Sequence, residues 1–153
     1  MIWLTTIGQK PIAAVNTLWA ALREEKIGAI EKIVVFYSED MKRELLTFTG
    51  WAECLFTEYQ KQQPKLQTVP FPTHDIKAFR TLIKRTISKI EAKILMDMTS
   101  GRKAMSALML LIGDLFPGKV EKVYYSFLTD DDYMNFLYPT IPLDVTQLHN
   151  LTE

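Results

Sequence analysis

The order of strand-like and helix-like segments limits the fold of this chain more than any other feature of its sequence. Residues 31–37, EKIVVFY, form an apolar run rich in β-branched residues, without the alternation of a half-exposed strand. Such a run is typical of a strand covered on both faces. Apolar residues at helical spacing follow it, and strand and helix alternate four times along the chain. This order predicts an α/β fold with a mostly parallel, Rossmann-like sheet and helices on both faces.

Periodicity and turn residues place the expected elements along the chain. Strands are expected at residues 2–6, 31–37, 65–71, 93–98 and 120–128. Helices are expected between them, beginning near Pro11, Ser38, Asp75 and Gly101. After Leu128 the sequence indicates only a turn and one or two further strands. No linker or repeat divides the 153 residues, so we expect a single domain over residues 1–153.

Charge and cysteine content limit the possible partners and compartments. The chain has 18 basic and 18 acidic residues, and a net charge of zero argues against a protein that coats DNA. No apolar stretch is long enough to span a membrane, and the first residues do not resemble a signal peptide. The single cysteine, Cys54, cannot form an internal disulfide and is expected to be a buried thiol. We therefore expect a cytoplasmic protein that binds neither DNA nor a membrane.

Motifs that hold common cofactors and metals are missing from the sequence. It contains neither the G-x-G-x-x-G dinucleotide motif nor the G-x-x-x-x-G-K-[ST] phosphate loop. His74 and His149 lie far apart, and one cysteine forms no Cys/His cluster. The acidic residues 130–132 are typical of a solvated turn. No cofactor and no metal are expected.

Two loops are expected to meet at one edge of the sheet. In the usual strand order 3-2-1-4-5, the first and fourth strands are neighbours, and ligands bind at the carboxyl ends where the order reverses. The loop at residues 8–10 follows the first strand, and the loop at residues 99–103 follows the fourth. These two loops should therefore line a single crevice.

The second loop, TSGRK, places two cations at the start of an apolar helix. Arg102 and Lys103 there oppose the helix dipole, so helix stability alone does not explain them. A phosphate would be bound by the free backbone amides and by both cations, and Gly101 allows its close approach. The pattern favours a local anion site over the alternative that both side chains only point into solvent.

The helix that follows this loop has no charged residue on any side. Residues 104–112 are almost wholly apolar around the full circumference, which indicates a helix buried all round. The sheet of one domain can cover only one side of it. A second copy of the chain would cover the other side, and we expect a homodimer built beside the anion site. The alternative is a central helix that neighbours in the same chain hide completely.

The two loops also resemble those of a known family. LTTIGQKP, from Leu4, and DMTSGRKAMSA, from Asp97, are similar to motifs of CRISPR-associated Rossmann fold (CARF) domains, and the resemblance covers essentially the whole chain. It implies a homodimer that binds a cyclic oligoadenylate, a second messenger of type III CRISPR defence, across the dimer axis. A two-fold ring such as cyclic tetra-adenylate can meet a two-fold dimer with the same residues twice. The contacts that the resemblance implies come from Thr6, Gly8, Gln9, Thr99, Ser100 and Gly101.

Within that family, the chain most resembles the standalone ring nucleases. It shows neither the R-x4-6-H motif of a HEPN ribonuclease nor room for a winged helix after Leu128. The implied reaction needs no metal, because the ribose 2′-hydroxyl attacks the phosphate and leaves a 2′,3′-cyclic phosphate. Lys103 or Arg102 would stabilise the phosphorane, and Lys10 would stabilise or protonate the leaving oxygen.

One departure from the family keeps other functions open. Related first loops often carry Ser or Thr near the position of Gln9 and Lys10, where this chain has neither. Lys10 would then replace that hydroxyl, or binding would be the main activity. A non-catalytic sensor or sponge for cyclic oligoadenylate is therefore the alternative to a ring nuclease, and an unrelated nucleotide-binding regulator with a similar sheet is a third possibility.

Overall fold

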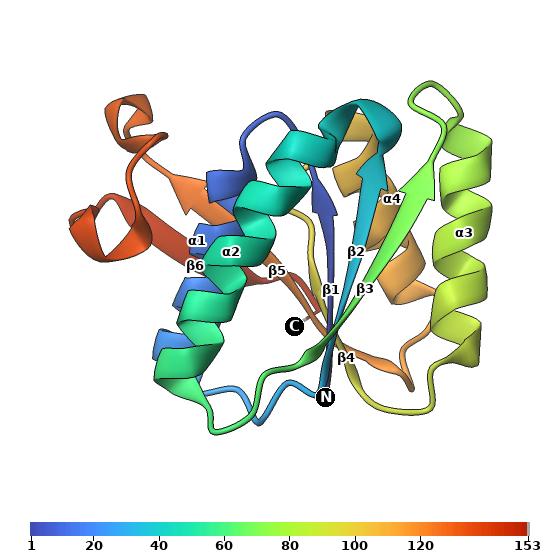
Figure 1. Ribbon diagram of the computed structural model, residues 1–153, viewed down its shortest axis with the longest axis horizontal. Helices are drawn as coiled ribbons and strands as arrows, with labels where there is room; N and C mark the ends of the chain where they lie inside the picture. The colour runs from blue at the N-terminus through green and yellow to red at the C-terminus, as the bar shows by residue number, and fades with distance from the viewer. Residues whose placement is uncertain (153) are drawn as a thin grey trace.

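The computed structural model describes residues 1–152 and shows one α/β domain built on a six-stranded sheet (Figure 1). The strand order is β3-β2-β1-β4-β5-β6. The first five strands pair in parallel, and β6 pairs antiparallel to β5. The strands are β1 Ile2–Ile7, β2 Lys32–Ser38, β3 Lys65–Phe71, β4 Ile94–Asp97, β5 Val120–Leu128 and β6 Thr146–Asn150. The expected fold class and the neighbouring positions of β1 and β4 are confirmed.

Two pairs of helices cover the two faces of this sheet (Figure 1). The helices are α1 Pro11–Glu24, α2 Lys42–Tyr59, α3 Ile76–Lys89 and α4 Lys103–Asp114. Side chains of α1 and α2 share one hydrophobic core with one face of the sheet. Side chains of α3 and α4 share a second core with the other face. Each face therefore has its own packed layer, as the continuous apolar strands indicate.

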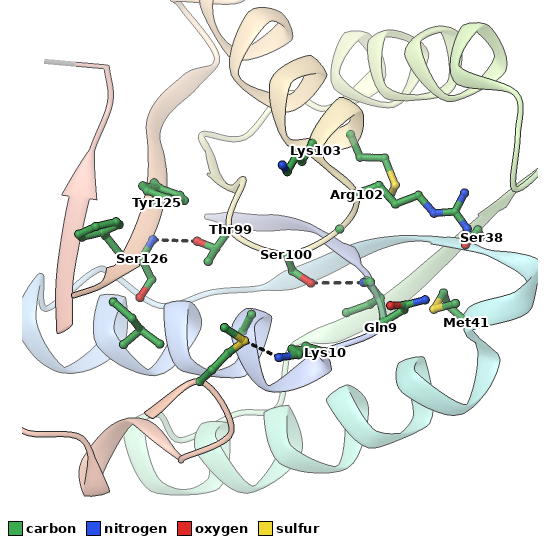
Figure 2. A pocket seen from close by; sticks show the side chains of 18 of the residues that line it. Gln9, Lys10, Ser38, Met41, Thr99, Ser100, Arg102, Lys103, Tyr125 and Ser126 are labelled. Carbon is green, nitrogen blue, oxygen red and sulfur yellow. Dashed lines mark hydrogen bonds between the residues drawn. The ribbon is translucent and has the colours of Figure 1, made fainter. Parts of the chain in front are cut away.

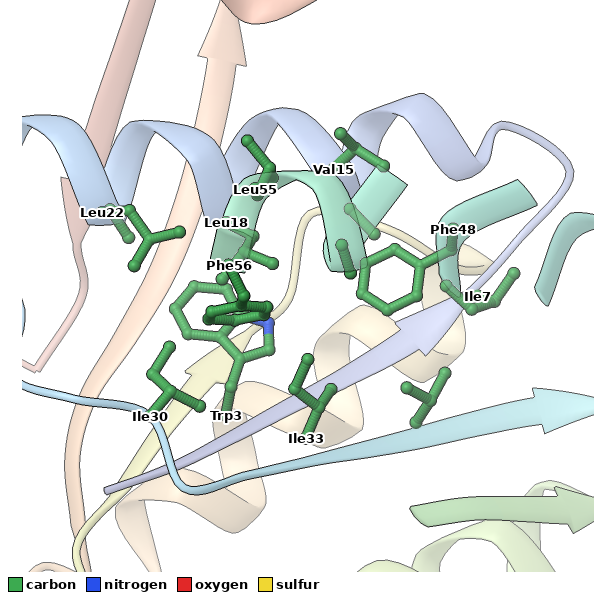
Figure 3. Packing of buried hydrophobic residues seen from close by; sticks show 14 of the residues in the cluster. Trp3, Ile7, Val15, Leu18, Leu22, Ile30, Ile33, Phe48, Leu55 and Phe56 are labelled. Atoms are coloured by element: carbon green, nitrogen blue, oxygen red, sulfur yellow. The ribbon is translucent and has the colours of Figure 1, made fainter. Parts of the chain in front are cut away.

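The central strand β1 divides its side chains between the two cores. All six of its residues are buried, and successive residues point to opposite faces. Trp3 lies in the core beneath α1 and α2, near Leu18 and Phe56, as Figure 3 shows. Its ring stacks on Tyr124 of β5, with ring centroids 5.8 Å apart. Leu4 lies in the core beneath α3 and α4.

The segment between β5 and β6 is a long excursion that packs against α1. Residues 129–145 contain two short 3-10 turns, Asp131–Tyr133 and Tyr138–Thr140, before β6 begins. The side chain of Asn16 anchors the excursion. Its amide donates to the carbonyl of Phe136 at 2.8 Å, and its oxygen accepts from the backbone N–H of Tyr138 at 2.9 Å. The uncertain end of the chain thus supplies a single further strand.

Two expectations about burial change with the structure. Cys54 is exposed on α2, so the expectation of a buried thiol is wrong. Helix α4 buries Met105, Met109 and Ile112, whereas Leu111 on its other side is 60% exposed. The alternative of a central helix hidden by its own chain is therefore wrong, and the homodimer stays a prediction. No helix in residues 1–152 combines the length and the apolar character needed to cross a lipid bilayer.

A glycine in α4 lets the helix lie close to the sheet, which gives a test of this packing. A Cβ atom at Gly113 would lie 2.7 Å from Cγ2 of Val123, whereas one at Gly50 in α2 would meet nothing within 4 Å. We expect Gly113→Ala to lower the free energy of unfolding by about 1–3 kcal/mol through overpacking. Gly50→Ala, the matched control, should raise it by up to about 1 kcal/mol through helix propensity. Urea unfolding of both variants checks this, and equal stabilisation by both would contradict the packing of α4.

Candidate functional site

The two predicted loops meet at the carboxyl edge of the sheet and line one pocket. The pocket has a volume of about 610 Å³. Figure 2 shows Lys103 and Lys10 between Tyr125 on one side and Arg102 on the other. Of the predicted residues, those that line it are Gly8, Gln9, Lys10, Thr99, Ser100, Gly101, Arg102 and Lys103. The convergence expected from the strand order is therefore present.

Thr6 is the one predicted contact residue outside the pocket lining. Its side chain is fully buried at the end of β1. Its hydroxyl donates a 2.6 Å hydrogen bond to the carbonyl of Ser100, and the Ser100 hydroxyl accepts from the backbone N–H of Gly8 at 3.3 Å. Thr6 and Ser100 thus hold the two loops together.

Two glycines make this approach of the loops possible. Gly101 has a φ of +99°, in the region that favours glycine, and a Cβ there would lie 2.6 Å from the Thr6 hydroxyl. A Cβ on Gly8 would lie 2.9 Å from both Cα and N of Gly101. Both positions therefore require glycine for steric reasons, which the sequence motif alone does not show.

A buried carboxylate supports the second loop from below. Asp97, the last residue of β4, accepts from the hydroxyl of Thr5 at 2.7 Å and from the backbone N–H of Thr99 at 2.8 Å. The Thr99 hydroxyl in turn accepts from the backbone N–H of Ser126 in β5 at 2.8 Å. Burial raises the pKa of Asp97 to about 6, and the hydrogen bonds from Thr5 and Thr99 oppose this rise.

The three predicted cations lie in different surroundings. Lys103, the first residue of α4, is exposed at the pocket and has no hydrogen bond or ion pair with any described residue. Arg102 donates to the carbonyl of Thr73 at 3.2 Å and forms an ion pair with Asp40 at 3.4 Å. Lys10 contacts the sulfur of Met134. Lys103 is therefore the cation best placed to meet a ligand anion.

The start of α4 adds to the positive character around Lys103. No side chain caps this helix, and its first turn contains no acidic residue. Backbone N–H groups at an uncapped helix start favour an anion. By contrast, the start of α3 is capped by Asp75, whose carboxylate accepts from the backbone N–H of Ala78 at 2.8 Å.

Several lining residues come from segments that the sequence did not single out. The carboxyl end of β5 contributes residues 125–128, and the excursion contributes Asp131 and Met134. Ser38 and Met41 come from the end of β2 and the turn after it. The rule that ligands bind at the carboxyl ends of parallel strands could have identified the residues of β5. No sequence signal places the excursion over the pocket.

Comparisons with known proteins agree with the fold. No protein-family model matches the chain, and no curated protein is significantly similar to it in sequence. Among solved structures, the chain is similar to Enterococcus italicus Csm6 bound to cyclic hexa-2′-fluoro-hexa-dAMP, with a TM-score of 0.69 and 13% sequence identity. The match covers 98% of this chain and 41% of the Csm6 chain. At this identity the similarity concerns the fold, and it supports a CARF-like, Rossmann-like architecture.

The buried carboxyl predicts a specific pH dependence of stability. With a pKa of about 6 in the folded protein against 3.8 normally, Asp97 contributes stability that is fully present below 3.8 and is lost as the pH rises through about 6. Asp97→Asn removes this titration. The difference in free energy of unfolding between variant and wild type should therefore shift in favour of the variant by roughly 2–3 kcal/mol from acidic to neutral pH.

Urea unfolding at pH 4 and pH 7.5 measures this difference (both pH values approximate). Asp114→Asn, at an exposed position at the end of α4, reports the effect of removing one surface charge. A pH-independent difference between Asp97→Asn and wild type would show that Asp97 does not titrate in this range.

Proposed function

We propose that this protein binds a cyclic oligoadenylate at the pocket and cleaves it as a metal-independent ring nuclease. The observation that carries the proposal is the convergence of two crossover loops, with Lys10, Lys103 and the uncapped start of α4, on one pocket. Two findings support it: the motif resemblance to CARF domains, and the similarity of fold to a Csm6 whose structure contains a cyclic hexanucleotide analogue. The alternative is a sensor or sponge that binds the ring without cleaving it.

The reaction would use the nucleophile that the substrate carries. A ribose 2′-hydroxyl attacks the adjacent phosphorus, the bond to the 5′-oxygen breaks, and the products end in a 2′,3′-cyclic phosphate and a 5′-hydroxyl. Lys103 and the backbone amides of α4 would stabilise the charge that develops on the phosphorane. Lys10 would donate a proton to the leaving oxygen. Asp131 is the single carboxylate among the lining residues and would be the nearest protein group able to accept the 2′-hydroxyl proton.

A homodimer would allow a two-fold ring to meet two such pockets. The exposed apolar side of α4, which includes Leu111 and Leu115, begins one turn beyond Lys103 and continues away from the pocket. Burying these side chains against a second copy would remove them from water and bring the two α4 starts close to one axis. The ring would then lie across this axis with equivalent phosphates at equivalent cations.

The cleavage proposal is tested with the purified protein, excess chelator, and cyclic tetra-adenylate and cyclic hexa-adenylate in turn. Linear products ending in a 2′,3′-cyclic phosphate are expected. Lys103→Ala should reduce the single-turnover rate by about 10²–10³, by analogy with loss of one oxyanion donor, while affinity falls less. Lys77→Ala is the matched control, because Lys77 is also an exposed lysine in the first turn of a helix but lies outside the pocket.

Three other results would change the proposal. A tight complex with an intact ring would replace the nuclease by the sensor or sponge. Equal cleavage by wild type and Lys103→Ala would remove Lys103 from the site. A 2′-fluoro ring, which lacks the nucleophile, should bind without being cleaved, and its cleavage would contradict the proposed chemistry.

The homodimer is tested by light scattering at micromolar concentration. We expect the mass of a dimer for the wild type and of a monomer for Leu111→Lys, because a charge at the centre of an apolar contact would be buried without a partner. Leu46→Lys, on α2 at a residue 73% exposed, is the matched control and should stay dimeric. A monomeric wild type, or a monomeric Leu46→Lys with a dimeric Leu111→Lys, would exclude the contact through α4.

A further inference from the structure

The last four residues of β5 extend beyond the end of its neighbour β4. The pairing of β4 with β5 ends at Asp97 and Tyr124, whereas β5 continues to pair with β6 as far as Leu128 and Thr146. Residues 125–128 therefore have a paired strand on one side only. Their other side faces the loop after β4 and forms a wall of the pocket.

Two aromatic side chains lie on this wall. Tyr125 and Phe127 are two residues apart on β5, so they point to the same face of the sheet as Val123. Helix α4 covers Val123, which is fully buried, but Phe127 is 42% exposed and Tyr125 is half-buried. The two ring centroids are 6.3 Å apart with an interplanar angle of 39°. The fold thus leaves two neighbouring rings open to the pocket, where no side chain of the domain buries them.

The pocket consequently has two chemically different sides. The loops after β1 and β4 contribute polar backbone together with Lys10 and Lys103, and Figure 2 shows Tyr125 and Ser126 across the pocket from Arg102. The side formed by β5 and the excursion contributes the two rings with Leu128 and Met134. A phosphate needs only the first side. A nucleotide carries a phosphate and a flat apolar base, and its two parts match the two sides.

We propose that Tyr125 and Phe127 form the surface on which a purine base of the bound nucleotide stacks. The inference rests on the proposed function and adds which part of the ligand contacts β5. Aromatic side chains bind unpaired bases through their π faces, and a purine presents a larger face than a pyrimidine. The cations would therefore set affinity for the backbone of the ring, and the rings of β5 would set the preference for adenine over uracil.

The test uses Phe127→Leu and Tyr125→Leu, which keep an apolar side chain but remove the ring. Binding is measured with the tetra- or hexa-adenylate ring that wild type binds more tightly and with the uridylate ring of the same size. Each variant should lose affinity for the adenylate ring on the order of tenfold, with a smaller loss for the uridylate ring. Phe136→Leu is the matched control, because Phe136 is 48% exposed and also pairs with another ring, that of Tyr133, but lies outside the pocket lining.

Salt dependence separates stacking from charge. Each leucine variant should keep the wild-type slope of affinity against salt concentration, whereas Lys103→Ala should reduce that slope by about one. Light scattering on the same samples should give the wild-type mass, because a stacking surface is not a subunit contact.

The outcomes distinguish this inference from the proposed function. Failure of wild type to bind either adenylate ring overturns the proposed function and the stacking surface with it. Wild-type binding that Phe127→Leu and Tyr125→Leu leave unchanged overturns the stacking surface alone. Equal losses for adenylate and uridylate rings, or a change of mass in the leucine variants, would also overturn it, because the two rings would then support the fold or the subunit contact.

Discussion

The close contact between Gly8 and Gly101 is the constraint on which the rest of the site depends. With Cβ atoms excluded at both residues, the loop after β1 and the loop after β4 touch through their backbones. From this point α1 runs to one face of the sheet and α4 to the other, so the starts of both helices meet at one pocket. The hydrogen bond from Thr6 to Ser100 holds the contact in place. A larger side chain at either glycine would separate the loops and, with them, Lys10 from Lys103.

A local concentration of positive potential explains how a chain without net charge could bind a polyanion. Arg102 and Lys103 are adjacent in sequence, yet Asp40 neutralises the first and no described residue neutralises the second. The carboxylate of Asp40 also accepts a 2.9 Å hydrogen bond from the hydroxyl of Thr73. Hydrogen bonds from Ser38 and Thr73 lower the pKa of Asp40, so it stays ionised beside Arg102. The unneutralised charge is thereby confined to the centre of the pocket, at the start of α4.

The sequence predicted the sheet order and the convergence of the loops, because both follow from the alternation of elements and from the chirality of parallel connections. It did not predict which side of a helix meets the core. In α2, apolar residues occupy a wide stripe, and Cys54 falls just outside the part that packs on the sheet. The contacts of residues 129–145 were equally hidden, since they depend on Asn16, a polar residue that only the folded chain brings to the excursion. Similarly, an aspartate at a strand end gives no sign of burial until Thr5 and Thr99 surround it.

The bonds that join the two loops have a consequence for the order of folding. Thr5 and Asp97, Thr6 and Ser100, and Gly8 and Ser100 lie 92, 94 and 92 residues apart along the chain. Closing such long loops carries a large entropic cost before any contact compensates for it, and contacts of this kind slow folding. The halves β1–α3 and β4–β6 must therefore dock before the pocket exists. A ligand that binds there recognises only chains in which this last docking step is complete, and by mass action it shifts the population toward them.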